Sequence, residues 1–311
     1  MMKKINILLL LLGITYNAIA QQDAMYSQYV FNGLIINPAY AGTRDVLSTS
    51  LLYRNQWVNI PGAPKTGMFT IDAPLKNQKV GLGLNVEFDK IGVTSHTGIS
   101  GAYSYRIKFT QSSLAFGVQV GAGFSNSNYT SVAYSDGSTG NTDPAFQNNY
   151  HDVIPNFGFG MYYYTPRFFV GFSVPQIAGN SIQKAIYGHS EGAHLDLANH
   201  YFISSGYLFD VSADVKIKPS VLLKYVNGAP MEMDLNGVVW FYDLLALGIS
   251  YRSLASIDFL AQIRISNQLY LGYAYEYATT SLNTFSSGSH EVMLQYIFDF
   301  SHAKIVTPRF F

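Results

Sequence analysis

Apolar and polar residues alternate strictly along many segments of the chain, each about ten residues long. The clearest is 80–88, VGLGLNVEF, in which every even position is apolar and every odd position is glycine, asparagine or glutamate. Residues 114–124 and 269–278 repeat the pattern. Because successive side chains of a β-strand point to opposite faces, this alternation predicts strands with one apolar face and one small or polar face.

Fourteen such segments follow one another along the chain. The predicted strands are 45–55, 65–74, 79–89, 96–109, 112–125, 154–164, 167–175, 198–209, 213–226, 230–241, 244–252, 256–266, 268–278 and 289–300. A soluble β-sandwich also alternates, but it has about seven to nine strands and a charged outer face. Here the second face is glycine and small polar residues, which favours a confined lumen. The pattern therefore predicts an all-β fold, a transmembrane antiparallel β-barrel of the outer membrane, over residues 45–300.

The connections between the predicted strands differ in length. The second, fourth, sixth, eighth, tenth and twelfth are short, whereas the first, fifth, seventh and last are long, 126–153 and 176–197 among them. The third, ninth and eleventh are intermediate. Outer-membrane barrels have short periplasmic turns and long extracellular loops. With an even number of strands, this order of long and short connections predicts that both termini lie in the periplasm.

The N-terminus has the pattern of a secretory signal. Lys3 and Lys4 precede an apolar run over 5–14, and the chain then reaches small residues that end at Ala20. The alternative, a membrane anchor, is disfavoured because Tyr16 and Asn17 interrupt the apolar run. We expect a signal peptide over residues 1–20.

The last predicted strand ends in an aromatic residue, Phe300, which resembles the C-terminal signal by which barrel proteins are recognised for insertion. The extension 301–311 contains Lys304 and Arg309, and we expect it to stay in the periplasm. It also ends in two phenylalanines, so either aromatic end fits the signal.

The composition fits a membrane barrel. The chain has 24 tyrosines and 21 phenylalanines, and only 12% of its residues are charged. Such aromatic residues suit an interface with one apolar and one wet side. The 19 basic and 19 acidic residues cancel, so no basic excess points to nucleic acid. There is no cysteine, so stability cannot come from disulfides.

An uncharged stretch, YVFNGLIINPAYAG at 29–42, precedes the first predicted strand. Left free, a segment this apolar would aggregate, and its proline lacks the N–H that an added strand would need. We therefore predict an N-terminal hatch over 21–44 that folds into or against the lumen at the periplasmic mouth of the barrel. Its aromatic side chains would wedge against a small-residue inner wall. The candidate hatch residues are Tyr26, Tyr29, Phe31, Asn32, Asn37, Pro38, Ala39 and Tyr40.

Four charged residues fall on the predicted inner faces of two neighbouring strands. Glu87 and Asp89 lie on one strand, and Arg106 and Lys108 lie on the next. We expect them to pair across the lumen wall. They can form a patch that selects solutes or contacts cargo, or a structural salt-bridge ladder, and the ladder is the favoured interpretation because lumen charges need only partners.

Two loop segments carry residue types found in metal sites. His189, Glu191 and His194 lack a helix that would bring them together, so solvated loop polarity is the better interpretation. The segment 136–143, DGSTGNTD, offers oxygen ligands for calcium, but Gln147 stands where an EF-hand needs glutamate. We predict no metal and no cofactor.

Compact serine–histidine or asparagine–histidine pairs occur at Ser289–His290 and Asn199–His200. Both lie at predicted strand starts, where a wet histidine is ordinary. We predict no catalytic residue and no enzyme activity.

Several blocks of the chain, which together span most of it in order, resemble the PorP/SprF family of type IX secretion proteins. They include QQDAMYSQYVFNGLIINPAYAG, YRNQWVNIPGAPKT, DAPLKNQKVGLGLNVEFDKIGVTSHTG, NFGFGMYYYTPRFFVGFSVPQI, KPSVLLKYVNGAPMEMDLN and SSGSHEVMLQYIFDF. The family is similar to fourteen-stranded FadL-type barrels, in which a segment with Asn-Pro-Ala enters the lumen as a hatch. Here those residues are Asn37, Pro38 and Ala39.

The resemblance implies a non-enzymatic outer-membrane component of the type IX secretion system. Its partners would be a cargo protein with a C-terminal sorting domain, of the adhesin or gliding-motility type, and the periplasmic ring and peptidoglycan-associated components. An alternative is a FadL-like channel for a small hydrophobic molecule. A barrel hydrolase that uses His200 or His290 is a third and weaker interpretation.

Overall fold

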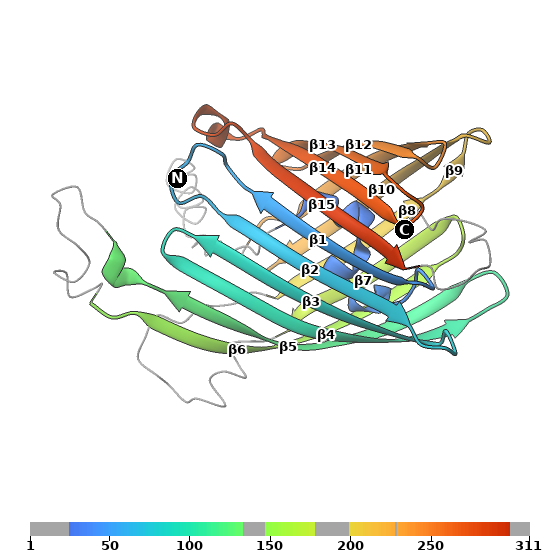
Figure 1. Cartoon of the computed structure of the whole chain (residues 1–311), viewed down its shortest axis with the longest axis horizontal. Helices are drawn as coiled ribbons and strands as arrows, with labels where there is room; N and C mark the ends of the chain where they lie inside the picture. Colours follow the sequence, from blue (N-terminus) through green and yellow to red (C-terminus); the bar gives the residue numbers. More distant parts are fainter. Residues whose placement is uncertain (1–24, 133–146, 178–198, 228, 299–311) are drawn as a thin grey trace, which may run out of the picture.

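The computed structural model describes residues 25–132, 147–177, 199–227 and 229–298 (Figure 1). Several sequence predictions concern residues outside these ranges. They are the signal peptide, the start of the hatch at 21–24, the C-terminal extension, the aromatic end at Phe300 and the loop residues at 136–143 and 189–194.

Long antiparallel strands make up most of the described residues (Figure 1). They are β1 (Leu47–Asn55), β2 (Lys65–Pro74), β3 (Val80–Ile91), β4 (Thr94–Lys108), β5 (Ser113–Ser127), β6 (Tyr150–Tyr164), β7 (Phe168–Ile177), β8 (His200–Tyr207), β9 (Phe209–Asp210), β10 (Val215–Val226), β11 (Glu232–Phe241), β12 (Leu245–Arg252), β13 (Ser256–Arg264), β14 (Leu269–Ala278) and β15 (Ser289–Phe298). Since β8 and β9 both pair with β10 and are separated by Leu208 alone, they form one interrupted barrel strand.

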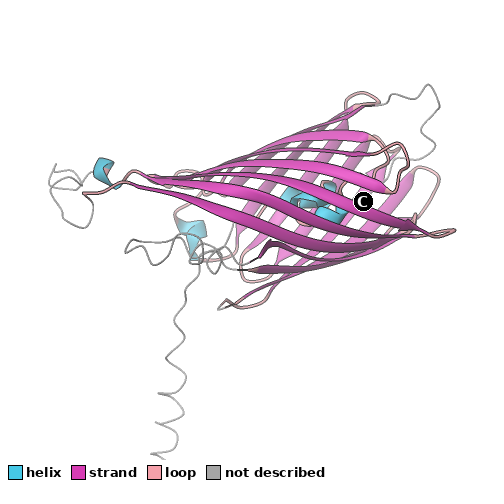
Figure 2. Ribbon diagram, turned by 90° about the horizontal axis from the view of Figure 1, so that it is seen from below, coloured by secondary structure: helices cyan, strands magenta, loops and turns pink. Residues whose placement is uncertain are grey.

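The sheet closes on itself, because β1 pairs with β15 as well as with β2 (Figure 2). Each strand is antiparallel to the next, and the pairing of Leu47 with Phe298 sets the closing register. With β8 and β9 counted as one strand, the barrel has fourteen, which confirms the prediction. A closed sheet has no free edge strands, so every strand bonds on both sides.

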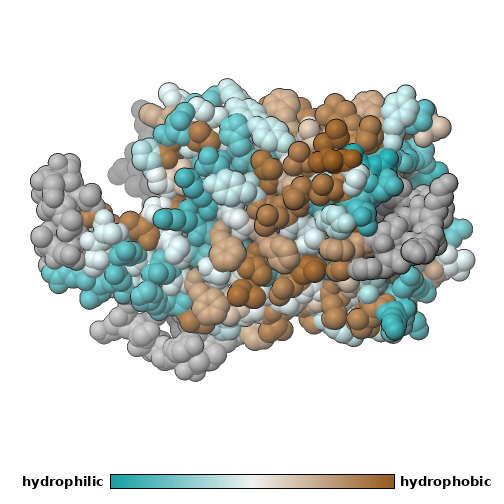
Figure 3. Space-filling model, in the orientation of Figure 1, coloured by the Kyte–Doolittle hydropathy of each residue, from teal (hydrophilic) through white to brown (hydrophobic). Residues whose placement is uncertain are grey.

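The two faces of the barrel wall differ as the alternation predicts. Leu82 and Val120 point outward and are 46% and 57% exposed. Inward neighbours such as Asn85 and Gln119 are buried. On the face shown in Figure 3, apolar residues form a band over the middle of the molecule, with hydrophilic residues toward both ends. This band is the surface that a bilayer requires.

The connections depart from the predicted classes at two places. The third connection is only residues 92–93, because β3 and β4 continue pairing as far as Ile91 and Thr94. The eleventh is only residues 253–255. Both are as short as the even-numbered turns, so the prediction of intermediate loops was wrong there. The ends of the barrel are still distinct. We call the end with the first, fifth, seventh and last connections the long-connection end, and the other the short-turn end.

Residues 25–46, which we call the N-terminal segment, lie inside the barrel (Figure 2). They form three short 3-10 helices, η1 (Ser27–Phe31), η2 (Gly33–Ile35) and η3 (Pro38–Tyr40). Two further 3-10 helices, η4 (Tyr129–Ser131) and η7 (Ser281–Thr284), lie in connections. In the described part of the chain, no helix has the length and apolar character to cross a membrane.

Candidate functional site in the barrel lumen

The N-terminal segment begins against the inner faces of β13 and β15. The backbone amides of Ser27 and Gln28 donate to the two carboxylate oxygens of Glu291, at 2.9 and 3.1 Å. The Ser27 hydroxyl donates to Asp258 Oδ2 at 2.7 Å. Hydrogen bonds to a charged acceptor are stronger than neutral ones, so these two carboxylates hold the start of η1 in place.

These carboxylates belong to a buried ionic network. Arg54 of β1 bonds to Glu291 and, at 2.9 Å, to Glu276 of β14. Arg252 of β12 bonds to Glu276 at 3.2 Å and to Asp234 of β11 at 3.1 Å. A buried charge is tolerated only when it has partners, and here carboxylates outnumber the guanidinium groups. The amides of the N-terminal segment therefore supply donors that the wall itself lacks.

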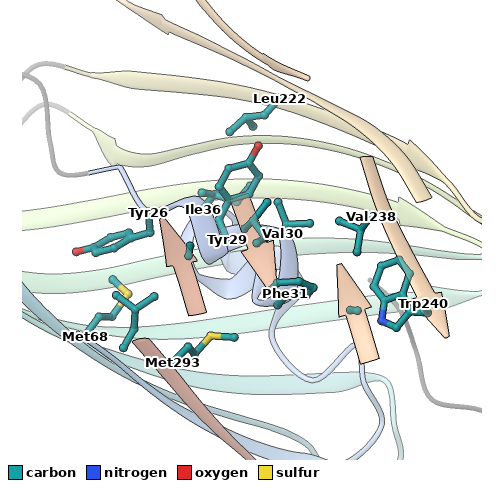
Figure 4. Packing of buried hydrophobic residues seen from close by; sticks show 14 of the residues in the cluster. Tyr26, Tyr29, Val30, Phe31, Ile36, Met68, Leu222, Val238, Trp240 and Met293 are labelled. Atoms are coloured by element: carbon teal, nitrogen blue, oxygen red, sulfur yellow. The ribbon is translucent and has the colours of Figure 1, made fainter. Parts of the chain in front are cut away.

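Aromatic side chains of η1 pack against large residues of the wall (Figure 4). The rings of Phe31 and Trp240 meet edge to face, with centroids 6.5 Å apart. Tyr26 and Tyr29 join the same buried cluster, which includes Met68 and Met293. The sequence-based expectation of a small-residue wall is wrong for these three aromatics, because the inner faces of β1, β2, β10, β11, β13 and β15 carry leucine, methionine or tryptophan.

The small-residue wall lies instead under the second half of the segment. Tyr40 packs with Ala102, Ala115 and Tyr162. A Cβ atom on Gly81 would lie 2.0 Å from the Ala41 carbonyl oxygen. Similar close approaches occur at Gly117 against Ala39 N, 2.2 Å, at Gly160 against Asn37 Oδ1, 2.0 Å, and at Gly272 against Gln28 Oε1, 2.2 Å. Glycine at these inward positions lets the backbone of Ala39 and Ala41 and the side chains of Gln28 and Asn37 approach the strands.

Two asparagines tie the segment to the wall and cap its helices. Asn32 Nδ2 donates to Ser50 Oγ at 2.7 Å and to Thr70 Oγ1 at 2.8 Å, while its oxygen accepts from the Leu34 amide. Asn37 Nδ2 donates to the Met161 carbonyl at 3.1 Å, while its oxygen accepts from the Ala39 amide that follows Pro38 in η3. Each side chain therefore donates hydrogen bonds to the barrel wall and accepts one from a backbone amide of the segment. Asparagine is a favoured N-cap residue, and proline is favoured at the first helical position.

Burial raises the pKa of two tyrosines of the segment. The Tyr26 hydroxyl donates to Glu87 Oε1 at 2.8 Å, and burial, followed by the nearby carboxylate charge, raises the Tyr26 pKa well above its usual value. Burial, followed by the charge of Asp234, does the same to the pKa of Tyr29, whose hydroxyl accepts from Asn236 Nδ2 at 2.8 Å. Both phenols therefore stay protonated at neutral pH.

The segment crosses the lumen from one wall to another. It starts at Ser27 in the long-connection half, passes η3 beside β4, β5 and β6, and joins β1 at the short-turn end. Its path therefore runs through the lumen from the long-connection half to the short-turn end. Near its end, Asp45 accepts from Arg106 at 2.8 Å and Asp72 accepts from the Gly42 amide at 2.7 Å.

The four charges predicted to pair across the wall do not come together. In the register of β3 and β4, Glu87 is opposite Gly98 and Asp89 is opposite His96. Arg106 follows Tyr105, which is opposite Val80 at the start of β3. Seven residues of β3 separate Val80 from Glu87, or about 23 Å at strand rise. Glu87 bonds to Tyr26, Asp89 to Thr66, Arg106 to Asp45 and Lys108 to Gln78. The antiparallel register places the acids and bases at opposite ends of the barrel, so the expected pairing was wrong.

The histidine pairs are not arranged for nucleophilic catalysis. Ser289 points inward and donates to Glu276, whereas His290 points outward to the Tyr273 hydroxyl at 2.7 Å. Adjacent strand residues face opposite sides of the sheet, which is the physical reason. His200 is buried and stacks on Phe202. Among the described residues, no group of three or more histidine and acidic side chains is placed to hold a metal.

Sequence reasoning did not single out the ionic network of Arg54, Arg252, Glu276 and Glu291. A signal was present, because each is a charged residue at an inward position of a strand that otherwise alternates. A lone charge on a lumen face indicates a partner elsewhere on the wall or on a segment inside it. The partners come from strands far apart in the sequence.

Solved structures that the chain is similar to are outer-membrane barrels. One is the outer-membrane protein Omp33 of Acinetobacter baumannii, with 10% identity, a TM-score of 0.49, and coverage of 82% of this chain and 100% of that one. Another is a FadL homologue of Pseudomonas aeruginosa, with 14% identity, a TM-score of 0.45, and coverage of 93% and 97%. No curated protein sequence matches.

A family model matches residues 18–296, nearly the whole chain, and its description is type IX secretion system membrane protein PorP/SprF. The closed antiparallel barrel and its apolar outer band agree with a membrane protein of this kind. The chain belongs to the PorP/SprF family of type IX secretion system membrane proteins.

Proposed function

We propose that this outer-membrane barrel is a non-enzymatic type IX secretion component that assists export and surface attachment of a cargo protein. The cargo carries a C-terminal sorting domain and is of the adhesin or gliding-motility type. The observation that supports this proposal is the packing of residues 25–46 inside the barrel, because a filled lumen suits a protein that binds partners more than one that conducts solutes.

The N-terminal segment acts as a plug in this proposal. Its side chains and backbone bond to residues of β1, β2, β3, β4, β6, β7, β10, β11, β13 and β15, which surround the lumen. Its apolar side chains form two buried clusters with the wall. A segment held on so many sides leaves only when many bonds break together, so it closes the route across the barrel.

Partners would then bind at the two ends of the barrel. The connections at the long-connection end would face the cell exterior and contact cargo. The short turns would face the periplasm, where the ring and peptidoglycan-associated components of the apparatus lie. Both termini would lie on the periplasmic side, after export directed by the signal peptide.

Deletion of the gene tests the proposal. We expect particular cargo proteins with a C-terminal sorting domain to disappear from the cell surface, and gliding to fail if the cargo is a motility adhesin. Mass spectrometry of protease-shaved surface peptides measures this, and complementation with the intact gene is the control. A surface proteome and motility that are unchanged by deletion would contradict it.

A FadL-like channel for a small hydrophobic molecule is the second candidate. A small, mainly aromatic and apolar cavity between the segment and the wall favours it. Tyr29, Tyr40, Tyr162 and Phe169 line this cavity, together with Lys218. Uptake of a labelled long-chain fatty acid that is lost on deletion would support the channel, and uptake that is unchanged would exclude it.

A further inference from the structure

We propose that the lumen on the long-connection side of the N-terminal segment is a binding site for an extended peptide with an apolar side chain. A cavity that is partly open to solvent lies there. Its floor is made by Met25, Ile35 and Ile36 of the segment. A concave site with an apolar floor and a few converging polar groups has the form of a ligand site.

The cavity opens toward the long-connection end. Glu87 lies in the second half of β3, His96 in the first half of β4, and Ile154 in the first half of β6. Those halves are the ones that the third and fifth connections join. A ligand would therefore enter from that end, while the N-terminal segment closes the opposite side.

Four primary amides line one side of this cavity. They are Asn85 of β3, Gln119 of β5, Asn156 of β6 and Gln176 of β7. Asn85 and Gln119 are 8% and 7% exposed. Asn85 Oδ1 and Gln176 Oε1 are buried with no hydrogen-bond partner in the described part of the chain. Buried polar atoms normally have partners, so these two acceptors point to a ligand that brings donors.

The chemistry of the amides selects a peptide. Each primary amide offers two donors and one acceptor group, which matches the alternating N–H and C=O groups of an extended backbone. The floor of methionine and isoleucine fits an apolar side chain of that peptide. A sugar would need polar groups on the floor as well, and a fatty acid would leave the amides without partners.

The charged residues of the cavity are already engaged. Glu87 accepts from the Tyr26 hydroxyl at 2.8 Å, and Lys224 lies 3.5 Å from Glu232. The site therefore offers uncharged groups to its ligand. The assignment of the peptide to an exported protein rests on the proposed function. The preference of the cavity for a peptide does not depend on that function.

The absence of cysteine makes a direct test available. A single thiol is introduced by Gln119→Cys, and its rate of reaction with iodoacetamide is measured on the purified barrel in detergent. The probe is a mixture of end-blocked decapeptides of random sequence. We expect the peptides to slow the reaction several-fold. Gln262→Cys is the matched control, since it faces the lumen at the short-turn end, and its rate should not change.

Comparison probes and variants make the test decisive. Maltotetraose and decanoate should give no protection at position 119. Adding Asn85→Ala should weaken peptide protection about tenfold, the effect of one or two lost hydrogen bonds, whereas Gln295→Ala should not. If Asn85→Ala fails to fold, as judged by heat-modified gel migration, Gln176→Ala replaces it. Peptides that give no protection, or a sugar or fatty acid that protects equally, would overturn the proposal.

This test is separate from the deletion test. Peptide protection with an unchanged surface proteome would retain the site and reject the secretion role. Loss of surface cargo without peptide protection would reject the site alone.

Discussion

The Oδ1 atom of Asn37 lies 2.0 Å from the position that a Cβ atom would take on Gly160. The same asparagine bonds to the Met161 carbonyl on β6, so it cannot retreat without losing that bond. The N-terminal segment is therefore seated on a strand that has room for it only because residue 160 lacks a side chain.

Substitution of that glycine should displace the segment. We expect Gly160→Ala to lower the free energy of unfolding by about 1–3 kcal/mol, the cost of an added group in a packed interior, and to raise single-channel conductance in planar bilayers. Gly67→Ala is the matched control, because a Cβ atom there has no neighbour within 4 Å. Equal conductance of the two variants would show that the segment does not depend on this contact.

The ionic anchor at the other end of the segment should be sensitive to neutralisation. We expect Glu291→Ala to cost about 3–5 kcal/mol, because Arg54 loses one of its two carboxylates and two amides lose their acceptor. Urea unfolding in lipid vesicles measures this. Asp243→Asn, which removes the partly exposed partner of Lys216, should cost less than about 1 kcal/mol. A loss at Glu291 as small as the control would contradict the anchor.

Trp240 can report the position of the segment. We expect Phe31→Ala to cost about 3–5 kcal/mol and to shift Trp240 emission to longer wavelength as water reaches the ring. The measurement is made in a Trp57→Phe background, since the chain has 2 tryptophans. Phe285→Ala, at a side chain that is 72% exposed, should leave the emission unchanged. An unshifted emission spectrum after Phe31→Ala would mean that other residues shield the Trp240 ring from water.

Alkaline pH should loosen the segment through its buried phenols. Because the pKa values of Tyr26 and Tyr29 are raised in the folded state, their contribution to stability is complete below the ordinary pKa of about 10. The contribution is lost as pH rises from there through the raised values, because the unfolded chain then releases protons that the folded chain keeps.

We therefore expect the free energy of unfolding to fall more steeply above about pH 10 in the native chain than in Tyr29→Phe, by up to about 1.4 kcal/mol per pH unit. Urea unfolding at a series of pH values measures the slope. Tyr242→Phe, at a tyrosine that is 69% exposed, should keep the native slope. Identical slopes for the native chain and Tyr29→Phe would rule out this titration.

The pattern of alternating residues determined the barrel. Segments such as 65–74 and 256–264 have a period of two along the chain, and that period depends on local backbone geometry alone. The number of strands and the apolar outer face follow from it. The proline and the asparagines of 29–42 also marked that stretch as irregular before any contact was known.

Which residues meet inside the lumen was decided only by the tertiary structure. The pairing of Glu87 with Tyr26, and of Arg106 with Asp45, depends on strand register and on the path of the N-terminal segment. A shift in strand register by an even number of residues keeps each side chain on its face but moves a charge toward the other end of the barrel. The alternating pattern does not reveal such a shift. For the same reason, which of the lumen-facing glycines receive the segment could not be told until the chain was closed into a barrel.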